Sequence, residues 1–491
     1  MKYTYLLPLL LLVACFEDKG NYAYEPPVEI RLADNSLRDT AILRGQHLTL
    51  RPGPRLVVEG NEVAINPGDY THAWRAYRRN LNDMTPVTLA ETPDLDTTVF
   101  LPTRTEPYRV VYSITSKASG VERSFAFNLT VTSRFSSAWL YLTEADDGTA
   151  ELMVRGTETA TGATVLEGGV LERSGFPYRG GGAKFVYWYL NSQSIIVGTG
   201  EATGYLDRSN FEWNDTRLVR FMMALPAPVD HTFEKAVSLG PTHWFDSRGN
   251  LLPMSPTVGV IYAPVNILPP AVTGTGKYDT VQVAPHVAGT TSSQLFHDTK
   301  NKRVMVYKST AANLKTYLEM LPPADRLANH RVFFMQALTN SRSVVIAKNL
   351  ADGKYYRYTY SGVTLQANPE EITNGQLLEG ARHMECDQPN GFFYVVSGNK
   401  LHAFRTNDDG TGELREVTIT NRPGLALDEI TYLGRYTLIA STAPHVILAT
   451  YAGTPGSGKV YHLKANPTEP LELSVENEIT GLDRVKSISR F

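Results

Sequence analysis

The chain has 491 residues and a mass of 54.4 kDa, more than one ordinary hydrophobic core accommodates, so at least two domains are expected. Hydrophobic residues make up 42% of the chain, which excludes a disordered chain. The net charge is −3, from 47 Lys and Arg against 50 Asp and Glu, so the protein has no overall positive charge that would attract a nucleic acid. The 26 Tyr, 38 Gly and 29 Pro, without long runs of helix-forming residues, predict an all-β protein.

The N-terminus carries a targeting signal. An apolar run over residues 6–14 is far shorter than the ~20 residues that cross a bilayer, so residues 1–14 are predicted to be a signal peptide. The run ends in Leu12-Val13-Ala14-Cys15, which resembles a bacterial lipobox. We therefore expect cleavage after Ala14 and attachment of lipid to Cys15, which anchors the chain because two or three acyl chains hold a protein on a membrane. Ordinary signal-peptidase cleavage, with an incidental Cys15, is the alternative.

Residues 15–27 form a tether before the first domain. It begins with the acidic stretch Phe16-Glu17-Asp18-Lys19, which looks like the surface-export signal of Bacteroidetes lipoproteins, although a solvated linker has the same composition. The chain has only two cysteines. With Cys15 carrying lipid, Cys386 has no cysteine to pair with, so neither a disulfide framework nor a cysteine zinc site is expected. Cys386 is predicted to be a buried thiol.

Residues 28–133 show short stretches of alternating polar and apolar residues separated by turns. This pattern over about 105 residues predicts an immunoglobulin-like β-sandwich. In Tyr70-Thr71-His72-Ala73-Trp74 the aromatic residues fall on alternate positions, so Trp74 is predicted to lie in the sandwich core and not to bind a ligand.

Several strings resemble the PKD-like lipoproteins of Bacteroidetes. They are Cys-x-x-Asp-Lys-Gly-Asn-Tyr-x-Tyr from Cys15, Tyr70-x-x-x-Trp74, and Phe127-x-Leu129-x-Val131-x-Ser133 followed by Trp139-Leu140. Ala138 stands where the family usually has Gly. The resemblance implies a surface lipoprotein encoded beside a SusC/SusD-like outer-membrane importer. It assigns no catalytic residue.

The sequence pattern of residues 134–491 also predicts strands and turns. The turn Asp146-Asp147-Gly148-Thr149-Ala150-Glu151-Leu152 recurs at residues 408–414 with six of seven positions identical. Repeated units of four strands and ~40–50 residues are typical of a β-propeller, and this length predicts about seven blades. A large sandwich or a β-helix is the competing arrangement. One short helix is predicted over residues 310–321, which Pro322 and Pro323 would end.

No motif for metal, phosphate or catalysis is complete. The Asp-Asp-Gly-Thr turns lack the spacing of a calcium loop and are typical of hairpins. The string Gly453-Thr454-Pro455-Gly456-Ser457-Gly458-Lys459 is followed by Val460 where a phosphate-binding loop needs Ser or Thr, and then by a strand pattern, which predicts a hairpin loop. The sequence has no His-Glu-x-x-His and no Gly-x-Ser-x-Gly. We therefore expect no metal, no cofactor and no enzymatic activity.

Aromatic residues are the remaining candidates for ligand binding. Trp213 and Trp244 stand among Asn, Asp, Gly and Pro, which predicts loop positions, and Trp188 lies in the aromatic run Tyr187-Trp188-Tyr189. Any of the three could stack on a sugar or a peptide, although most aromatic residues of such a fold pack between blades.

The sequence as a whole predicts a non-enzymatic lipoprotein on the outer membrane that faces the cell exterior and binds a glycan or peptide. Its expected partners are a SusC/SusD-like transporter pair and other surface lipoproteins. Two alternatives stay open: a surface hydrolase of the glycosidase type, whose two carboxylates have no fixed spacing in sequence, and an adhesin.

Overall fold

The computed structural model describes residues 29–34, 36–58, 60–78, 85–104, 106–189, 194–228, 230–239, 242–255, 259–275, 277, 279–282, 288–289, 293–308, 315, 317–338, 341–386, 392–407, 411–436, 445–466 and 468–491. It divides into two units, Met1–Thr132 and Ser133–Phe491. This boundary lies one residue before the predicted one. The lipid-attachment residue Cys15 and the tether lie outside the described residues.

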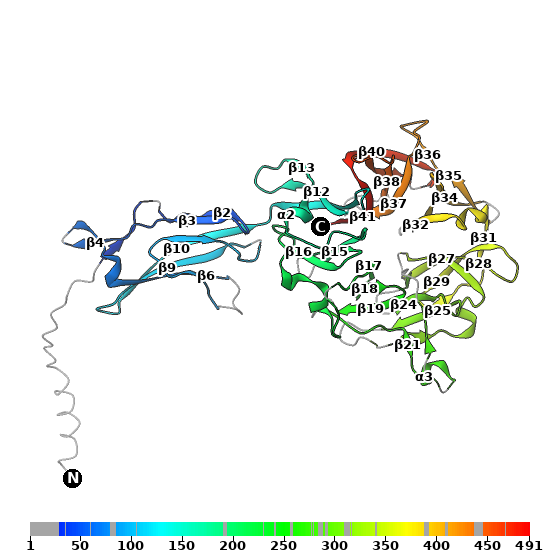
Figure 1. The fold of residues 1–491 in the computed structure, drawn as a ribbon, viewed down its shortest axis with the longest axis horizontal. Coiled ribbons are helices and arrows are strands. Elements are labelled where there is room, and N and C mark those ends of the chain that lie inside the picture. Colours follow the sequence, from blue (N-terminus) through cyan, green and yellow to red (C-terminus); the bar gives the residue numbers. More distant parts are fainter. Residues whose placement is uncertain are drawn as a thin grey trace, which may run out of the picture. The chain divides into compact units, whose positions relative to one another are not determined.

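The N-terminal unit is a β-sandwich (Figure 1). Its largest sheet has five strands in the order β2-β10-β9-β6-β7, and β2 runs parallel to β10. A three-stranded sheet, β1-β4-β5, and the pair β3-β8 complete the unit. The strands are β1 (Glu29–Arg31), β2 (Thr40–Leu43), β3 (His47–Leu50), β4 (Arg55–Val58), β5 (Asn61–Ala64), β6 (Tyr70–Tyr77), β7 (Val87–Ala90), β8 (Leu95–Thr98), β9 (Tyr108–Ser116) and β10 (Glu122–Thr132), with the 3₁₀ turn η1 at Pro67–Asp69.

The predicted core residue Trp74 lies at the centre of this sandwich. Its side chain is fully buried, its ring stacks on Tyr112 with centroids 4.2 Å apart, and its Nε1 donates a hydrogen bond to the carbonyl of Thr92 at 2.9 Å. The Tyr108 hydroxyl donates to the carbonyl of Pro102 at 2.8 Å, six residues upstream, as in the tyrosine corner of immunoglobulin-like domains. The prediction of an immunoglobulin-like sandwich is confirmed.

The C-terminal unit is built from antiparallel sheets that follow one another around a ring (Figure 1). Counted over the described residues, there are seven of these blades. Blade 1 consists of β41 (Arg484–Arg490), β11 (Phe135–Glu144), β12 (Ala150–Glu158) and β13 (Thr164–Glu167); blade 2 of β14 (Ala183–Tyr189), β15 (Ser194–Thr199) and β16 (Thr203–Asp207); blade 3 of β17 (Lys235–Leu239), β18 (Thr242–Ser247), β19 (Asn250–Ser255) and β20 (Val260–Ile261); and blade 4 of β23 (Ala288–Gly289), β24 (Ser293–Asp298), β25 (Arg303–Lys308) and β26 (Glu319–Met320).

The remaining three blades complete the ring, and a parallel pairing of β31 with β35 joins blades 5 and 6. Blade 5 consists of β27 (His330–Ala337), β28 (Arg342–Asn349), β29 (Tyr355–Ser361), β30 (Thr364–Leu365) and β31 (Glu370–Thr373); blade 6 of β32 (Ala381–Cys386), β33 (Phe393–Ser397), β34 (Lys400–Thr406) and β35 (Gly412–Glu416); and blade 7 of β37 (Glu429–Tyr436), β38 (His445–Tyr451), β39 (Gly458–Ala465) and β40 (Glu472–Leu482), with β36 (Thr418–Ile419) on its outer edge. The pair β21 (Ile267–Leu268) and β22 (Asp279–Thr280) lies between blades 3 and 4 in sequence.

The two ends of this unit meet in blade 1. The C-terminal strand β41 pairs antiparallel with β11, with Trp139 opposite Arg490, so the ring is closed by the chain's own ends. Middle strands such as β15 are buried along their whole length because neighbouring blades cover both faces. The prediction of a β-propeller with about seven blades is confirmed.

Short helices occur only in connections within the described residues: α2 (Val170–Arg173), α3 (Pro270–Thr273), η2 (Asp215–Arg217), η3 (Val219–Met222), η4 (Pro323–Asp325) and η5 (Gly375–Leu378). The predicted helix over residues 310–321 is wrong where the structure describes it, because Glu319–Met320 pairs with β25 as the outer strand of blade 4. Residues 309–314 lie outside the described residues. Cys386 is buried, as predicted.

Candidate functional site

Trp244 lies in strand β18 and is fully buried. Its Nε1 donates a hydrogen bond to Oε1 of Gln294 at 2.8 Å, and its ring meets those of Phe296 and Tyr307 edge to face at 4.8 and 4.7 Å. The predicted loop position is wrong, because the turn residues near Trp244 in sequence form the hairpin that follows it. The buried ring presents no face to a ligand.

Trp213 lies in a loop, as predicted, directly before η2. It is half-buried and packs edge-on against Phe176 at 5.7 Å and Tyr178 at 6.3 Å. Its Nε1 is buried and has no hydrogen-bond partner among the described residues. The indole of Trp213 therefore packs partly against the core next to α2. Its contact with a ligand stays a prediction.

Trp188 lies in β14 and is half-buried. Its ring packs on Phe491 at 5.4 Å, and the guanidinium of Arg208 lies over both rings, 5.5 Å from Trp188 and 4.7 Å from Phe491. Trp188 and Trp213 border one core cluster, whereas Trp244 belongs to another. The structure therefore does not bring the three tryptophans together in one site.

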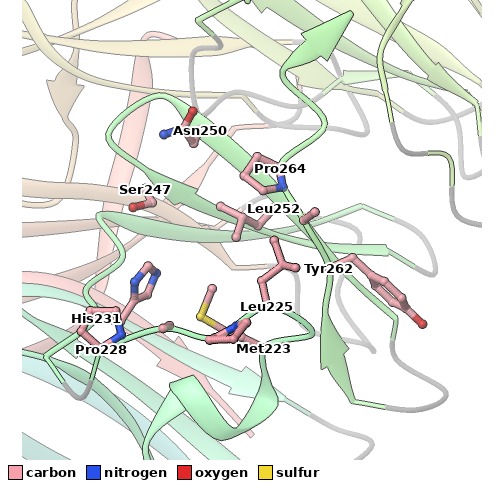
Figure 2. A pocket seen from close by; sticks show the side chains of 12 residues that line it. Met223, Leu225, Pro228, His231, Ser247, Asn250, Leu252, Tyr262 and Pro264 are labelled. Atoms are coloured by element: carbon pink, nitrogen blue, oxygen red, sulfur yellow. The ribbon is translucent and has the colours of Figure 1, made fainter. Parts of the chain in front are cut away.

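A pocket lies instead beside blade 3 (Figure 2). It has a volume of about 300 Å³ and is built from the loop before β17, the β18–β19 hairpin and the segment after β20. Its lining residues are Met223, Leu225, Pro226, Ala227, Pro228, His231, Ser247, Asn250, Leu252, Tyr262, Ala263 and Pro264.

Backbone contacts hold the two outer walls of this pocket together. Met223 forms a parallel bridge with Ile261, and the amide of Ala224 donates to the carbonyl of Ile261 at 2.8 Å. The amide of Tyr262 donates to the carbonyl of Pro253 in β19 at 2.8 Å. Proline residues on both walls fix their own φ angles, which restricts the backbone at Pro226, Pro228 and Pro264.

Besides Tyr262, three polar residues line the pocket: His231, Ser247 and Asn250. His231 and Ser247 lie on one side of it, and the ring of Tyr262 extends away on the other (Figure 2). Burial lowers the pKa of His231, whose ring packs edge-on against Phe233 at 4.7 Å. Its Nε2 is buried and has no hydrogen-bond partner among the described residues.

Apolar side chains surround the opening. Leu225 is 51% exposed and Tyr262 is 38% exposed, and Phe221, just before the pocket loop, is 57% exposed. No lining residue, all of them within the described part of the chain, is a carboxylate, so this pocket lacks the carboxylate pair of a typical glycosidase. Its chemistry suits the burial of an apolar group with one or two hydrogen bonds.

Sequence reasoning did not find this pocket. Its walls come from segments about 40 residues apart, and only the fold brings them together. The available signal was Leu225-Pro226-Ala227-Pro228, an apolar and proline-rich run in a loop, where exposed apolar residues are uncommon.

None of the helices among the described residues has the length and apolar character needed to span a membrane. Nor do three or more His, Cys, Asp or Glu side chains of that part of the chain converge as a metal site would require.

Several solved structures match the chain at low sequence identity. A quinoprotein alcohol dehydrogenase-like protein from Bacteroides thetaiotaomicron is 11% identical, with 94% of this chain and 100% of that chain covered and a TM-score of 0.35. A Synechocystis ACO mutant is 10% identical, with 70% and 92% covered and a TM-score of 0.36. The WD40 domain of SCAP from fission yeast is 6% identical, with 57% and 62% covered and a TM-score of 0.33.

No curated protein matches the sequence. A family model does match, over a segment that includes the whole described sandwich and continues through the strands β11 to β13 of blade 1. That model is the PKD-like family, and it matches residues 15–172, about the N-terminal third of this chain.

Proposed function

We propose that this protein is a lipid-anchored, non-enzymatic component of the outer membrane that faces the cell exterior and binds a peptide beside a SusC/SusD-like importer. The observation that carries the proposal is the pocket of Figure 2, with apolar walls and an exposed apolar opening. A preformed, largely apolar pocket with a few polar groups is the usual form of a binding site.

The lining favours a peptide over a glycan. Nine of the twelve lining residues are Met, Leu, Pro, Ala or Tyr, and the only polar ones besides Tyr262 are His231, Ser247 and Asn250. A sugar presents a hydroxyl on nearly every carbon, and each one buried without a partner costs free energy. An apolar side chain of a peptide has no hydroxyl group that needs a hydrogen-bond partner when it is buried. A neighbouring peptide group can form a hydrogen bond with His231.

The anchor rests on the lipobox-like string that ends at Cys15. The PKD-like match begins at the same residue, which supports Cys15 as the first residue of the mature protein. The importer association rests on the resemblance to PKD-like lipoproteins.

Changing Cys15 to Ala is expected to release the protein from the membrane fraction and to abolish incorporation of labelled palmitate, because no other acyl-chain site is predicted. Cys386→Ala, which removes the other cysteine, should leave both unchanged. Retention of Cys15→Ala in membranes contradicts the anchor. Affinity purification of the unmodified protein from the same membranes tests the partners: a large β-barrel and a second lipoprotein in near-equal amounts support the importer association.

Changing Leu225 to Asp is expected to weaken peptide binding at least about tenfold, which corresponds to about 1.4 kcal/mol. The change places a charge at the apolar opening, and because Leu225 is half exposed it should not disturb folding. The probes are peptides enriched from a random ten-residue library on the unmodified protein, with affinities measured by fluorescence anisotropy.

Leu350→Asp is the matched control. Leu350 is 43% exposed and lies in the β28–β29 hairpin of blade 5, away from the pocket residues in sequence and fold. This variant should bind the peptides as the unmodified protein does. Equal loss in both variants, or selection of glycans and no peptides in a parallel array, contradicts the proposal.

A further inference from the structure

An arginine lies next to the peptide pocket in the chain. Arg220 belongs to the 3₁₀ turn η3, and its carbonyl accepts a hydrogen bond from the amide of Met223 at 3.3 Å. Met223 is the first of the residues that line the pocket (Figure 2). The backbone of Arg220 is therefore bonded directly to the pocket wall.

The guanidinium of Arg220 packs on an aromatic ring. Its central carbon lies 4.5 Å from the centroid of the Phe221 ring, which is itself exposed. The side chain of Arg220 is half-buried, and its Nε is buried. Stacking uses the flat face of a guanidinium, so the N–H groups in its plane stay available for hydrogen bonds.

No carboxylate of the described residues pairs with Arg220. Its side chain makes no hydrogen bond or ion pair with any of them, and this includes Asp215 in η2 and Asp230 beyond the pocket wall. Arg217, three residues earlier, is by contrast paired with Asp207 at 3.5 Å. Arg220 is thus a cation beside the pocket whose charge the described part of the fold does not neutralise by contact.

We propose that Arg220 binds a carboxylate of the peptide ligand, so that the site selects peptides in which an acidic group lies close to the buried apolar side chain. This inference rests on the proposed peptide binding. The carboxylate can belong to Asp, to Glu or to the peptide's C-terminus. An extended peptide advances about 3.4 Å per residue, so we expect the acidic group within about three positions of the apolar residue.

The two parts of such a site have different roles. Apolar contacts in the pocket are not directional, so they accept several side chains of similar size. A guanidinium binds a carboxylate through two parallel hydrogen bonds of fixed geometry. Arg220 would therefore determine which peptides bind, and in which direction, more than how tightly they bind.

The test compares acid and amide forms of the same peptide. Peptides enriched from the random ten-residue library on the unmodified protein are synthesised with Asp or Glu and again with Asn or Gln, and each with a free or an amidated C-terminus. The unmodified protein should bind the acid form about fivefold more tightly, as for a good solvent-accessible ion pair. Arg220→Gln should bind both forms equally, because the carboxylate has lost its partner.

Arg248→Gln is the matched control, with circular dichroism spectra showing that both variants are folded. Arg248 is exposed and follows the lining residue Ser247 in the turn between β18 and β19. Its replacement removes the same charge near the pocket and should keep the preference for the acid form.

Three results overturn the inference: acid and amide forms that bind the unmodified protein equally well, a preference that persists in Arg220→Gln, and an equal loss of preference in both variants. The last result would mean that the overall charge near the pocket, and not contact with Arg220, attracts the acid. A library that yields no binding peptide contradicts the proposed function and this inference with it, so the two failures can be told apart.

Discussion

Replacing Trp244 with alanine is expected to lower the free energy of unfolding of the propeller by about 3–5 kcal/mol, the usual cost of deleting a fully buried large aromatic side chain. The change removes the edge-to-face contacts with Phe296 and Tyr307 and takes the indole donor away from Gln294. Urea unfolding followed by circular dichroism measures the loss.

Two other variants test whether the cost comes from packing. Trp244→Phe keeps one aromatic ring but loses the hydrogen bond and part of the buried volume, so it should cost less than Trp244→Ala. Trp213→Ala removes a half-buried ring and should cost less than Trp244→Ala. A Trp244→Ala protein that unfolds like the unmodified chain but no longer binds its ligand contradicts the packing role.

The sandwich and the hairpins could be predicted because local patterns encode them. The alternation around Trp74 places every second residue of β6 inside, and the structure buries His72, Trp74 and Ala76. The predicted Asp147-Gly148 turn closes β11 and β12, with Gly148 at φ 82° and the amide of Thr149 bonded to Oδ1 of Asp147 at 2.8 Å. Asp408-Asp409-Gly410 of the matching turn lies outside the described residues.

Long-range pairing explains what could not be predicted. Glu319–Met320 follows a helix-like pattern in sequence but lies beside β25, whose hydrogen bonds override a weak local preference. The pairing of Trp139 with Arg490 that closes the ring joins residues at opposite ends of the unit, and no local pattern marks it.

The site residues depend even more on the fold. Arg248 and Gly249 form the turn between β18 and β19, so the turn-like composition near Trp244 belongs to the residues that follow it and not to the strand in which it lies. The pocket combines residues from separate parts of the chain. The sequence could indicate which residue types are candidates for a site, but it could not show which of them lie close together in the fold.

Acidification from pH 6.5 to pH 4 is expected to destabilise the propeller, with His297 responsible for about 3 kcal/mol of the loss. Burial lowers the pKa of His297 to about 4, and the side chain is only 5% exposed. In the unfolded chain a histidine titrates near pH 6.5. Between these values the unfolded state binds a proton that the folded state does not, so the free energy of unfolding falls as the pH falls and is fully retained above about 6.5.

His297→Leu separates this effect from other acid-sensitive groups. Neither ring nitrogen of His297 has a hydrogen-bond partner among the described residues, so leucine should cost little at pH 7.5, because no bond is broken. Urea unfolding at a series of pH values should then show an acid loss smaller by about 3 kcal/mol than in the unmodified protein. Parallel pH profiles of His297→Leu and the unmodified protein contradict the assignment, because a histidine that is neutral in the fold must contribute to the slope.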